Sequence, residues 1–218
     1  MTRTLKVDLF TDIVCPWCLV GSVRLDQAIA RLPADIAVEV ENHPFLLDPN
    51  TPPEGTNVPE MLRTKYGRDP QQIWGRLRDE ARASGIDLDP ARQPMSYRTD
   101  AAHTLIAHAK PNGTQHALAN ALADAHFLEI RKIDDPEVLA DIATGFGFDR
   151  AEALALVTDP AELARTRQRA LAAAQQGISG VPFFVFEGKY GMSGCQPDAL
   201  FDRAFALAMS GEEGAGAA

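Results

Sequence analysis

The order of secondary-structure patterns along the chain limits its fold more than any other feature. Residues 5–10, LKVDLF, alternate with the period of two that is typical of a strand, and residues 36–45 repeat this alternation. Between them, apolar residues recur at helical spacing over about residues 16–31. Strand signals return only at 183–192, where FFVF, a Glu-Gly turn and KYGM predict a hairpin. A last helix is expected from about 196 to 209.

Nearly every segment between about residues 59 and 176 has the apolar spacing and alanine content of a helix, so we expect five to seven helices there. Without this block, the order βαβ–ββα remains, and its two halves can share one sheet. We therefore predict an α/β fold with one mixed sheet, flanking helices and a large all-helical insertion. The expected division is a discontinuous domain of residues 1–50 and 177–210, an insertion over 51–176, and a flexible tail over 211–218.

Composition excludes some classes of partner. The 218 residues are 45% hydrophobic and 23% charged, with a formal net charge of −9, and carry no dense stripe of basic residues. Nucleic acid and anionic membranes are therefore not expected as partners. No apolar run approaches the roughly 20 residues that span a bilayer. Because the N-terminal sequence also lacks an export signal, we expect a cytoplasmic protein.

The stretch DIVCPWCLVG places Cys15 and Cys18 where the first strand gives way to a helix. A helix start leaves backbone N–H groups unpaired and carries the positive end of the helix dipole, which favours the thiolate of Cys15 over its thiol. Pro16 suits the first helical position. Cys18, one turn later, can reach Cys15 and displace a partner captured there as a mixed disulfide.

Two plainer interpretations of the cysteines are less favoured. Buried inert cysteines would not need the strand-to-helix setting or the adjacent Pro and Trp. A zinc site usually needs four ligands, and no second CxxC or paired-histidine motif supplies them, so no metal is expected. Each histidine is interpreted as a surface residue or a core residue with its hydrogen bonds satisfied; these are His43, His103, His108, His116 and His126.

Asp12 lies three residues before Cys15, and two roles are open for it. Its carboxylate could accept the proton of the resolving thiol or raise the pKa of that thiol by repulsion. The interpretation that we favour is that Asp12 caps or braces the loop.

Three segments together carry a family resemblance: CPWC after the first strand, HPFLLDPNTPPEG, and GISGVPFFVFEGKYGMSGCQPDAL. In this order they resemble the DsbA-like branch of the thioredoxin superfamily, particularly its cytoplasmic FrnE-type oxidoreductases. The resemblance implies a thioredoxin fold interrupted by a helical insertion, with Cys15 as nucleophile and Cys18 as resolving thiol. It also implies that Pro182 follows a cis peptide bond and that Val181 and Pro182 face the cysteine pair.

The sequence departs from the family pattern at three places. Cys195 stands where relatives commonly have a small residue, and it is either a small structural residue, which we favour, or an auxiliary redox thiol. Phe183 replaces a smaller residue beside Pro182 and could narrow the substrate groove. The dipeptide Pro16-Trp17 differs from those of better-known relatives, which leaves the redox potential undetermined.

The sequence thus predicts a thiol–disulfide oxidoreductase that acts on proteins or small molecules through a mixed disulfide at Cys15. It needs no bound cofactor, although glutathione is a possible co-substrate. One alternative is a glutathione-dependent isomerase or transferase like 2-hydroxychromene-2-carboxylate isomerase or the kappa-class glutathione transferase. Those relatives typically present a serine at the nucleophile position, whereas this chain keeps both cysteines. Another alternative is a noncatalytic redox-sensing or chaperone-like protein.

Overall fold

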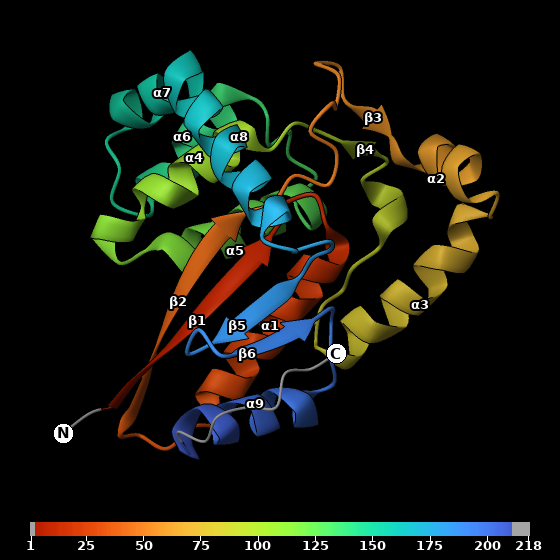
Figure 1. Cartoon of the computed structure of the whole chain (residues 1–218). Coiled ribbons are helices and arrows are strands. Elements are labelled where there is room, and N and C mark those ends of the chain that lie inside the picture. The colour runs from red at the N-terminus through yellow and green to blue at the C-terminus, as the bar shows by residue number, and fades with distance from the viewer. Residues whose placement is uncertain (1–2, 211–218) are drawn as a thin grey trace.

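A computed structural model describes residues 3–210. Both ends of this range contribute to one four-stranded mixed sheet with the strand order β2-β1-β5-β6, and the helices between them lie above the sheet and along its right side in Figure 1. The elements of the sheet half are β1 (Arg3–Thr11), α1 (Pro16–Ala30), β2 (Ile36–Pro44), β5 (Phe183–Phe186), β6 (Tyr190–Ser193) and α9 (Asp198–Ser210). This is the mixed α/β arrangement that the sequence predicts.

Strand β1 is the centre of the sheet. It pairs parallel with β2, from Arg3 opposite Ile36 onward, and antiparallel with β5, where Phe10 lies opposite Phe183. The alternate residues Leu5, Val7 and Leu9 are fully buried and pack with residues of α1 and α9. The period of two in the sequence therefore places one face of β1 in the core.

Aromatic rings join α9 to the sheet. Phe184 and Phe186 of β5 meet Phe201 and Phe205 of α9 edge to face, with ring centroids 5.1 and 5.2 Å apart. Helix α9 begins at Asp198, two residues later than predicted, because Pro197 disfavours a helical conformation for Gln196. The predicted tail, 211–218, lies outside the described residues.

The block between β2 and β5 contains seven α-helices within the described chain, at the upper end of the predicted range. Two short 3-10 turns, Pro90–Arg92 and Lys110–Asn112, and the two-residue strands β3 (Thr56–Asn57) and β4 (Met95–Ser96) connect them. The helices are α2 (Val58–Tyr66), α3 (Pro70–Ala83), α4 (Asp100–His108), α5 (Gln115–Phe127), α6 (Pro136–Thr144), α7 (Arg150–Thr158) and α8 (Pro160–Gln175).

The sequence marks several of these helix starts with an aspartate followed by proline. Asp69, Asp135 and Asp159 are N-caps whose side chains accept a hydrogen bond from a backbone N–H of the first turn. The following proline occupies a position that needs no hydrogen-bond donor. These local signals explain why the helices of this block can be predicted from the sequence.

The helical block and the sheet half share their cores. Ile13, in the loop after β1, packs among buried residues of α4 to α7. Leu19 and Val20 of α1 pack against residues of α2, α3 and α5. The segment that carries both cysteines is therefore held on two sides by the insertion. No helix in the described part of the chain has the length and apolar character needed to cross a membrane.

Candidate active site

Cys15 is the N-cap of α1, and Pro16 is the first helical residue. Cys15 has an extended backbone (φ −93°, ψ 108°), and its carbonyl accepts the N–H of Cys18 at 2.9 Å. Both cysteines are free thiols and nearly buried, with 5% and 4% of their surface exposed. The strand-to-helix junction predicted from the sequence thus places Cys15 at the positive end of the helix dipole.

The loop before β5 lies against Cys15. The peptide bond between Val181 and Pro182 is cis, as the resemblance implies. The Sγ of Cys15 lies 3.8 Å from the carbonyl oxygen of Val181. Val181 and Cys15, 166 positions apart in sequence, therefore contact each other as predicted.

Gly21 of α1 makes room for this loop. A Cβ atom at Gly21 would lie 2.9 Å from Cγ of Pro182 and 3.3 Å from Cζ of Phe184. Gly21 therefore permits the close approach of Pro182 to α1, a role that the sequence analysis missed. The available signal is a glycine inside a helical pattern, which often marks close packing.

The two thiols have different surroundings. Burial, a hydrogen bond with Cys15 and charge repulsion from Cys15 raise the pKa of Cys18 well above its usual value. Cys18 therefore keeps its proton at neutral pH until an acceptor takes it. The asymmetry suits a division between an attacking thiol and a resolving thiol.

The Asp12 carboxylate has two different environments, one for each oxygen. Oδ2 accepts the N–H of Leu47 at 2.8 Å and so braces the loop after β2, which is the role favoured from the sequence. Oδ1 lies 3.5 Å from Nε2 of His103 and has no hydrogen-bond partner among residues 3–210. Asp12 is only 2% exposed, so solvent hardly reaches this oxygen.

Two histidines of the insertion differ from the sequence expectation. His103 on α4 and His126 on α5 are buried, yet Nε2 of His103 and Nδ1 of His126 have no hydrogen-bond partner in the described chain. Burial lowers the pKa of His126 to about 4, and the nearby Asp12 carboxylate opposes that shift only in part. The expectation of core histidines with satisfied hydrogen bonds is therefore wrong here, because packing buries both rings without placing a partner within hydrogen-bond distance of these two nitrogens.

A cavity of about 20 Å³ borders Asp12 and Cys18. Asn42 of β2, Ser22 of α1 and Asn120 of α5 add polar atoms to its wall. A space of this size accommodates a single water molecule.

The remaining predicted residues lie around the cysteine pair. Trp17 is partly buried, and the Arg76 guanidinium of α3 lies 5.8 Å from the centre of its ring. Cys195, like Trp17, packs against the apolar cluster that joins α1 to α2, α3 and α5, where burial raises the pKa of its thiol to about 11. This favours a structural role for Cys195, because a thiol with such a pKa is a poor nucleophile at neutral pH.

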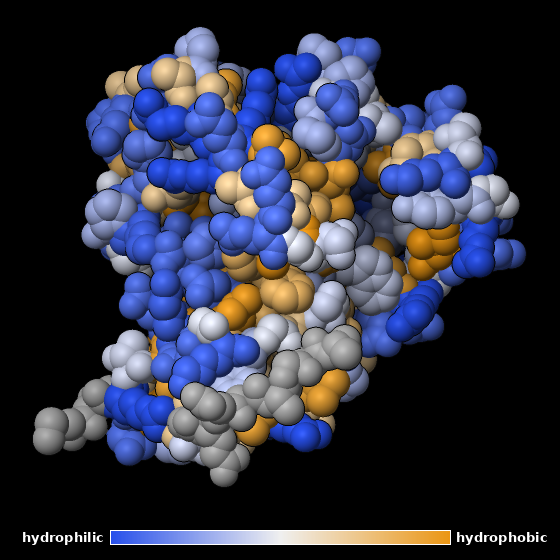
Figure 2. Space-filling model, viewed as in Figure 1, coloured by the Kyte–Doolittle hydropathy of each residue, from blue (hydrophilic) through white to orange (hydrophobic). Residues whose placement is uncertain are grey.

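Apolar surface gathers between the helical block and the strands β5 and β6 in Figure 2. Partly or fully exposed apolar residues near the cysteine pair come from three segments of the chain: Val14, Phe45, Leu47, Val181 and Phe183. The Phe183 ring lies edge-on to Phe10 and over Gly191 of β6, and its narrowing of a substrate groove stays a prediction.

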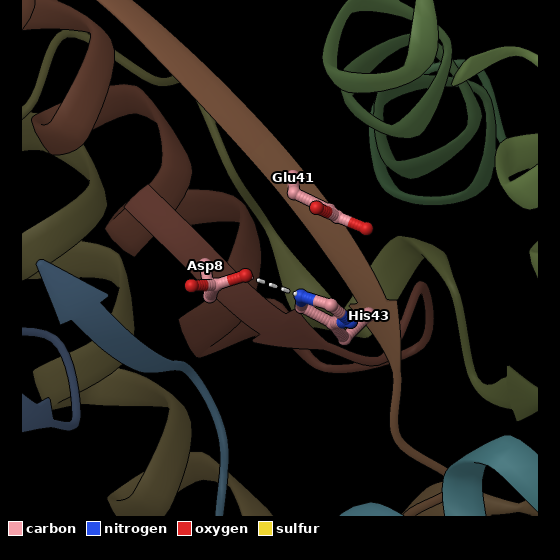
Figure 3. Close-up of side chains that lie close together, drawn as sticks. All are labelled: Asp8, Glu41 and His43. Atoms are coloured by element: carbon pink, nitrogen blue, oxygen red, sulfur yellow. Dashed lines mark hydrogen bonds and ion pairs between the residues drawn. The ribbon is translucent and has the colours of Figure 1, made fainter. Parts of the chain in front are cut away.

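A second titratable cluster lies on β1 and β2, away from the cysteines. Oδ1 of Asp8 accepts a hydrogen bond from Nε2 of His43 at 2.8 Å, and Glu41 lies next to them (Figure 3). Burial acts to raise the pKa of Glu41, but hydrogen bonds from Lys110 and Lys6 outweigh it and hold the pKa at about 2. Because two ammonium groups already occupy Glu41, this cluster suits a structural ion-pair network better than a metal site.

The comparisons with known proteins agree with this geometry. Residues 6–206 match the family described as DSBA-like thioredoxin domain. The chain belongs to this family. The crystal structure of a probable DsbA oxidoreductase, SCO1869 from Streptomyces coelicolor, is 35% identical, with a TM-score of 0.85 over 95% of this chain and 91% of that one.

Two further relatives are more distant. The uncharacterized protein YwbO of Bacillus subtilis (strain 168) is 27% identical over 92% of this chain and 96% of its own length. The structure of a 2-hydroxychromene-2-carboxylate isomerase is 18% identical, with a TM-score of 0.67 over 94% of this chain and 93% of that one. That likeness shows a shared fold.

Proposed function

We propose that this protein is a thiol–disulfide oxidoreductase that exchanges disulfides with protein or small-molecule thiols through Cys15 and Cys18. The observation that carries the proposal is the position of the Cys15 sulfur. It lies at the start of α1, 3.8 Å from the Val181 carbonyl beside a cis proline, with Cys18 one turn behind it. A helix start stabilises an attacking thiolate.

The chemistry has two balanced steps. The Cys15 thiolate attacks a substrate disulfide, forms a mixed disulfide, and releases one substrate sulfur as a thiolate that takes a proton from solvent. Cys18 then loses its proton and attacks the sulfur of Cys15, which forms the Cys15–Cys18 disulfide and breaks the bond to the second substrate sulfur. Two electrons pass from the cysteine pair to the substrate, and the reverse sequence oxidises a substrate dithiol.

The residues around the pair support this sequence in distinct ways. The raised pKa of Cys18 keeps it from competing with Cys15 as the first nucleophile. Asp12 is the nearby carboxylate that can accept the Cys18 proton. The partly exposed apolar residues around Val181 offer a surface for an extended substrate segment.

Glutathione is the small thiol that we propose as co-substrate, and a reducing compartment such as the cytoplasm is the setting that we propose. The FrnE-type branch remains our more specific prediction. Cell fractionation tests the compartment, and turnover of the oxidised protein with glutathione tests the co-substrate.

The decisive experiment compares three serine variants in reduction of insulin disulfides with glutathione as electron donor. Cys15→Ser should abolish turnover, whereas Cys18→Ser should accumulate a mixed disulfide at Cys15 visible by mass spectrometry. Cys195→Ser is the matched control and should keep near wild-type turnover. Full turnover in Cys15→Ser would refute the assigned nucleophile.

A second function is a glutathione-dependent isomerase, and the fold likeness to 2-hydroxychromene-2-carboxylate isomerase motivates it. That chemistry needs no resolving thiol, so its turnover would survive Cys18→Ser. A noncatalytic redox sensor would instead bind partners in one oxidation state and show no multiple turnover in either assay.

A further inference from the structure

An arginine of the helical insertion lies beside the cysteine motif. Arg76 of α3 is exposed, and its guanidinium carbon lies 5.8 Å from the centre of the Trp17 ring. Trp17 belongs to the CPWC stretch, two residues after Cys15 and directly before Cys18. The electron-rich face of an indole attracts a cation at this distance. Helix α3, which runs beside α1 in Figure 1, therefore holds a positive charge at the rim of the redox site.

The acidic residues that could neutralise Arg76 on its own helix already have other partners. Ion pairs on a helix form three or four residues apart, and from Arg76 these positions are Asp79 and Glu80. Oε2 of Glu80 lies 2.6 Å from Nη2 of Arg24, and Asp79 pairs with Arg82 at 3.4 Å. Within residues 3–210, Arg76 forms no ion pair. Its N–H groups thus remain available to a ligand.

The partner of Glu80 also fixes where α3 lies. Arg24 of α1 is only 6% exposed, and besides Glu80 it donates to Oγ of Ser84 at 2.9 Å and to the Gln196 carbonyl at 3.1 Å. A buried arginine with these bonds ties α3 to α1 and to the loop after β6, because losing one partner would leave a buried charge unpaired. The place of Arg76 beside the motif is therefore set by the fold.

The other surface around the cysteine pair carries no charge. It is formed by apolar side chains, which discriminate between substrates by shape and not by charge: Val14, Phe45, Leu47, Val181 and Phe183. A guanidinium stacked on a ring still points its N–H groups outward in its own plane, where they match the two oxygens of a carboxylate. Arg76 is thus placed to read the charge of a molecule that reacts at Cys15.

We propose that Arg76, held on the Trp17 ring, gives the redox site a preference for small disulfides and thiols that carry a carboxylate near the reacting sulfur. This inference rests on the proposed function, and the bonds that form and break are those of the exchange at Cys15. The formal net charge of −9 repels such molecules, but ions screen that repulsion beyond about 8 Å at physiological ionic strength. A local cation therefore decides the preference, and Arg76 is its specificity-determining residue.

The test uses three disulfides that differ only in their end groups. These are 3,3′-dithiodipropionate, which is anionic, bis(2-hydroxyethyl) disulfide, which is neutral, and cystamine, which is cationic. The rate constant for oxidation of the reduced cysteine pair is measured with each by acid quenching and mass spectrometry. The ratio of the anionic to the neutral rate constant is compared between proteins, so that differences in reagent reactivity or in the folded fraction cancel.

Arg76→Gln should lower this ratio about threefold to fivefold, the size expected for one exposed charge pair. Arg76→Glu should lower it further and favour cystamine, whereas Arg76→Lys should keep it within about twofold of wild type. Arg203→Gln on α9 changes the net charge equally at an exposed site and is the matched control, with an unchanged ratio. High salt should bring the wild-type ratio toward that of Arg76→Gln. An unchanged ratio in Arg76→Gln, or an equal drop in Arg203→Gln, would overturn the proposal.

A second measurement separates this preference from the proposed function. Iodoacetate and iodoacetamide alkylate a thiol with the same leaving group and differ in charge, so they need no disulfide exchange. The ratio of their rates at Cys15, followed by peptide mass spectrometry, should fall about threefold in Arg76→Gln and stay constant in Arg203→Gln. An unchanged alkylation ratio in Arg76→Gln would contradict the preference. Absence of oxidation by all three disulfides in the wild-type protein would instead refute the oxidoreductase function.

Discussion

Two carboxylate–imidazole pairs, one with its aspartate in β1 and the other with its aspartate directly after β1, have opposite surroundings. Asp8 and His43 are partly exposed, lie 2.8 Å apart, and sit beside Glu41 with its two lysine partners (Figure 3). Asp12 and His103 are buried, lie 3.5 Å apart, and each leaves one atom unpaired within residues 3–210. The exposed pair makes a hydrogen bond, whereas the two atoms of the buried pair are too far apart for one. The same residue types thus form a hydrogen-bonded ion pair near the surface and an unsatisfied contact in the core.

The largest difference between the pairs should appear when each aspartate loses its charge. Asp12→Asn should slow the release of substrate from the Cys15 mixed disulfide about 1,000-fold, or about 4 kcal/mol, because Cys18 loses its proton acceptor. Asp8→Asn should change the same rate less than about twofold. Single-turnover release of a coloured thiol measures both. Equal rates for the two variants would show that Asp12 has no part in proton transfer.

The next largest effect is a loss of folding stability at acid pH, caused by the buried ring of His126. Its folded-state pKa, about 4, is below its usual value of 6.5, so the folded state disfavours the charged ring. Its contribution to stability is full above pH 6.5 and is lost as the pH falls from 6.5 toward 4, by up to about 3 kcal/mol. Urea unfolding at a series of pH values should show this decline.

His126→Phe should flatten the pH dependence of the free energy of unfolding between pH 6.5 and 4, while His43→Gln should leave it in place. The aromatic replacement keeps most of the ring contacts with Phe127 and Tyr97. A slope that persists in His126→Phe would assign the acid sensitivity to another group.

A smaller effect on activity and stability is expected when a glycine is replaced by alanine, either at the site or away from it. Gly21→Ala should slow disulfide exchange about tenfold and destabilise the protein by about 1–3 kcal/mol, because the new Cβ displaces Pro182. Gly75→Ala in α3 meets nothing within 4 Å and should stabilise the protein by about 0.4–1 kcal/mol. Thermal unfolding and insulin reduction measure the two effects, and equal outcomes would show that Pro182 tolerates the methyl group.

The smallest effect belongs to Glu41 in the exposed cluster. Its pKa is about 2, below the usual 4.5, so its stabilisation is full above pH 4.5 and is lost as the pH falls toward 2. Solvent screens these ion pairs, so we expect well under 1 kcal/mol. Unfolding of Lys110→Met in low salt between pH 4.5 and 2 should show a slightly shallower decline than the wild-type protein. A loss of unfolding free energy as steep as the one expected from His126 would mean that solvent does not screen the ion pairs of Glu41.

Much of the scaffold was accessible from local patterns. Alternating residues placed β1 and β2, Asp-Pro pairs marked the starts of α3, α6 and α8, and the CPWC stretch placed Cys15 at the start of α1. The expected contact of Val181 with Cys15 came from the family resemblance rather than from any local pattern. The contact of His103 with Asp12 and the role of Gly21 escaped the sequence analysis because each depends on one partner more than 80 positions away.

The sequence by itself determined the order of strands and helices, the helix caps and the spacing of the cysteine pair, because these depend on neighbours within a few residues. Only the tertiary structure decided which histidine is buried against a carboxylate and which stays at the surface. That choice depends on packing between α4, α5 and the end of β1, and burial sets both the cost of a charge and the availability of a proton acceptor.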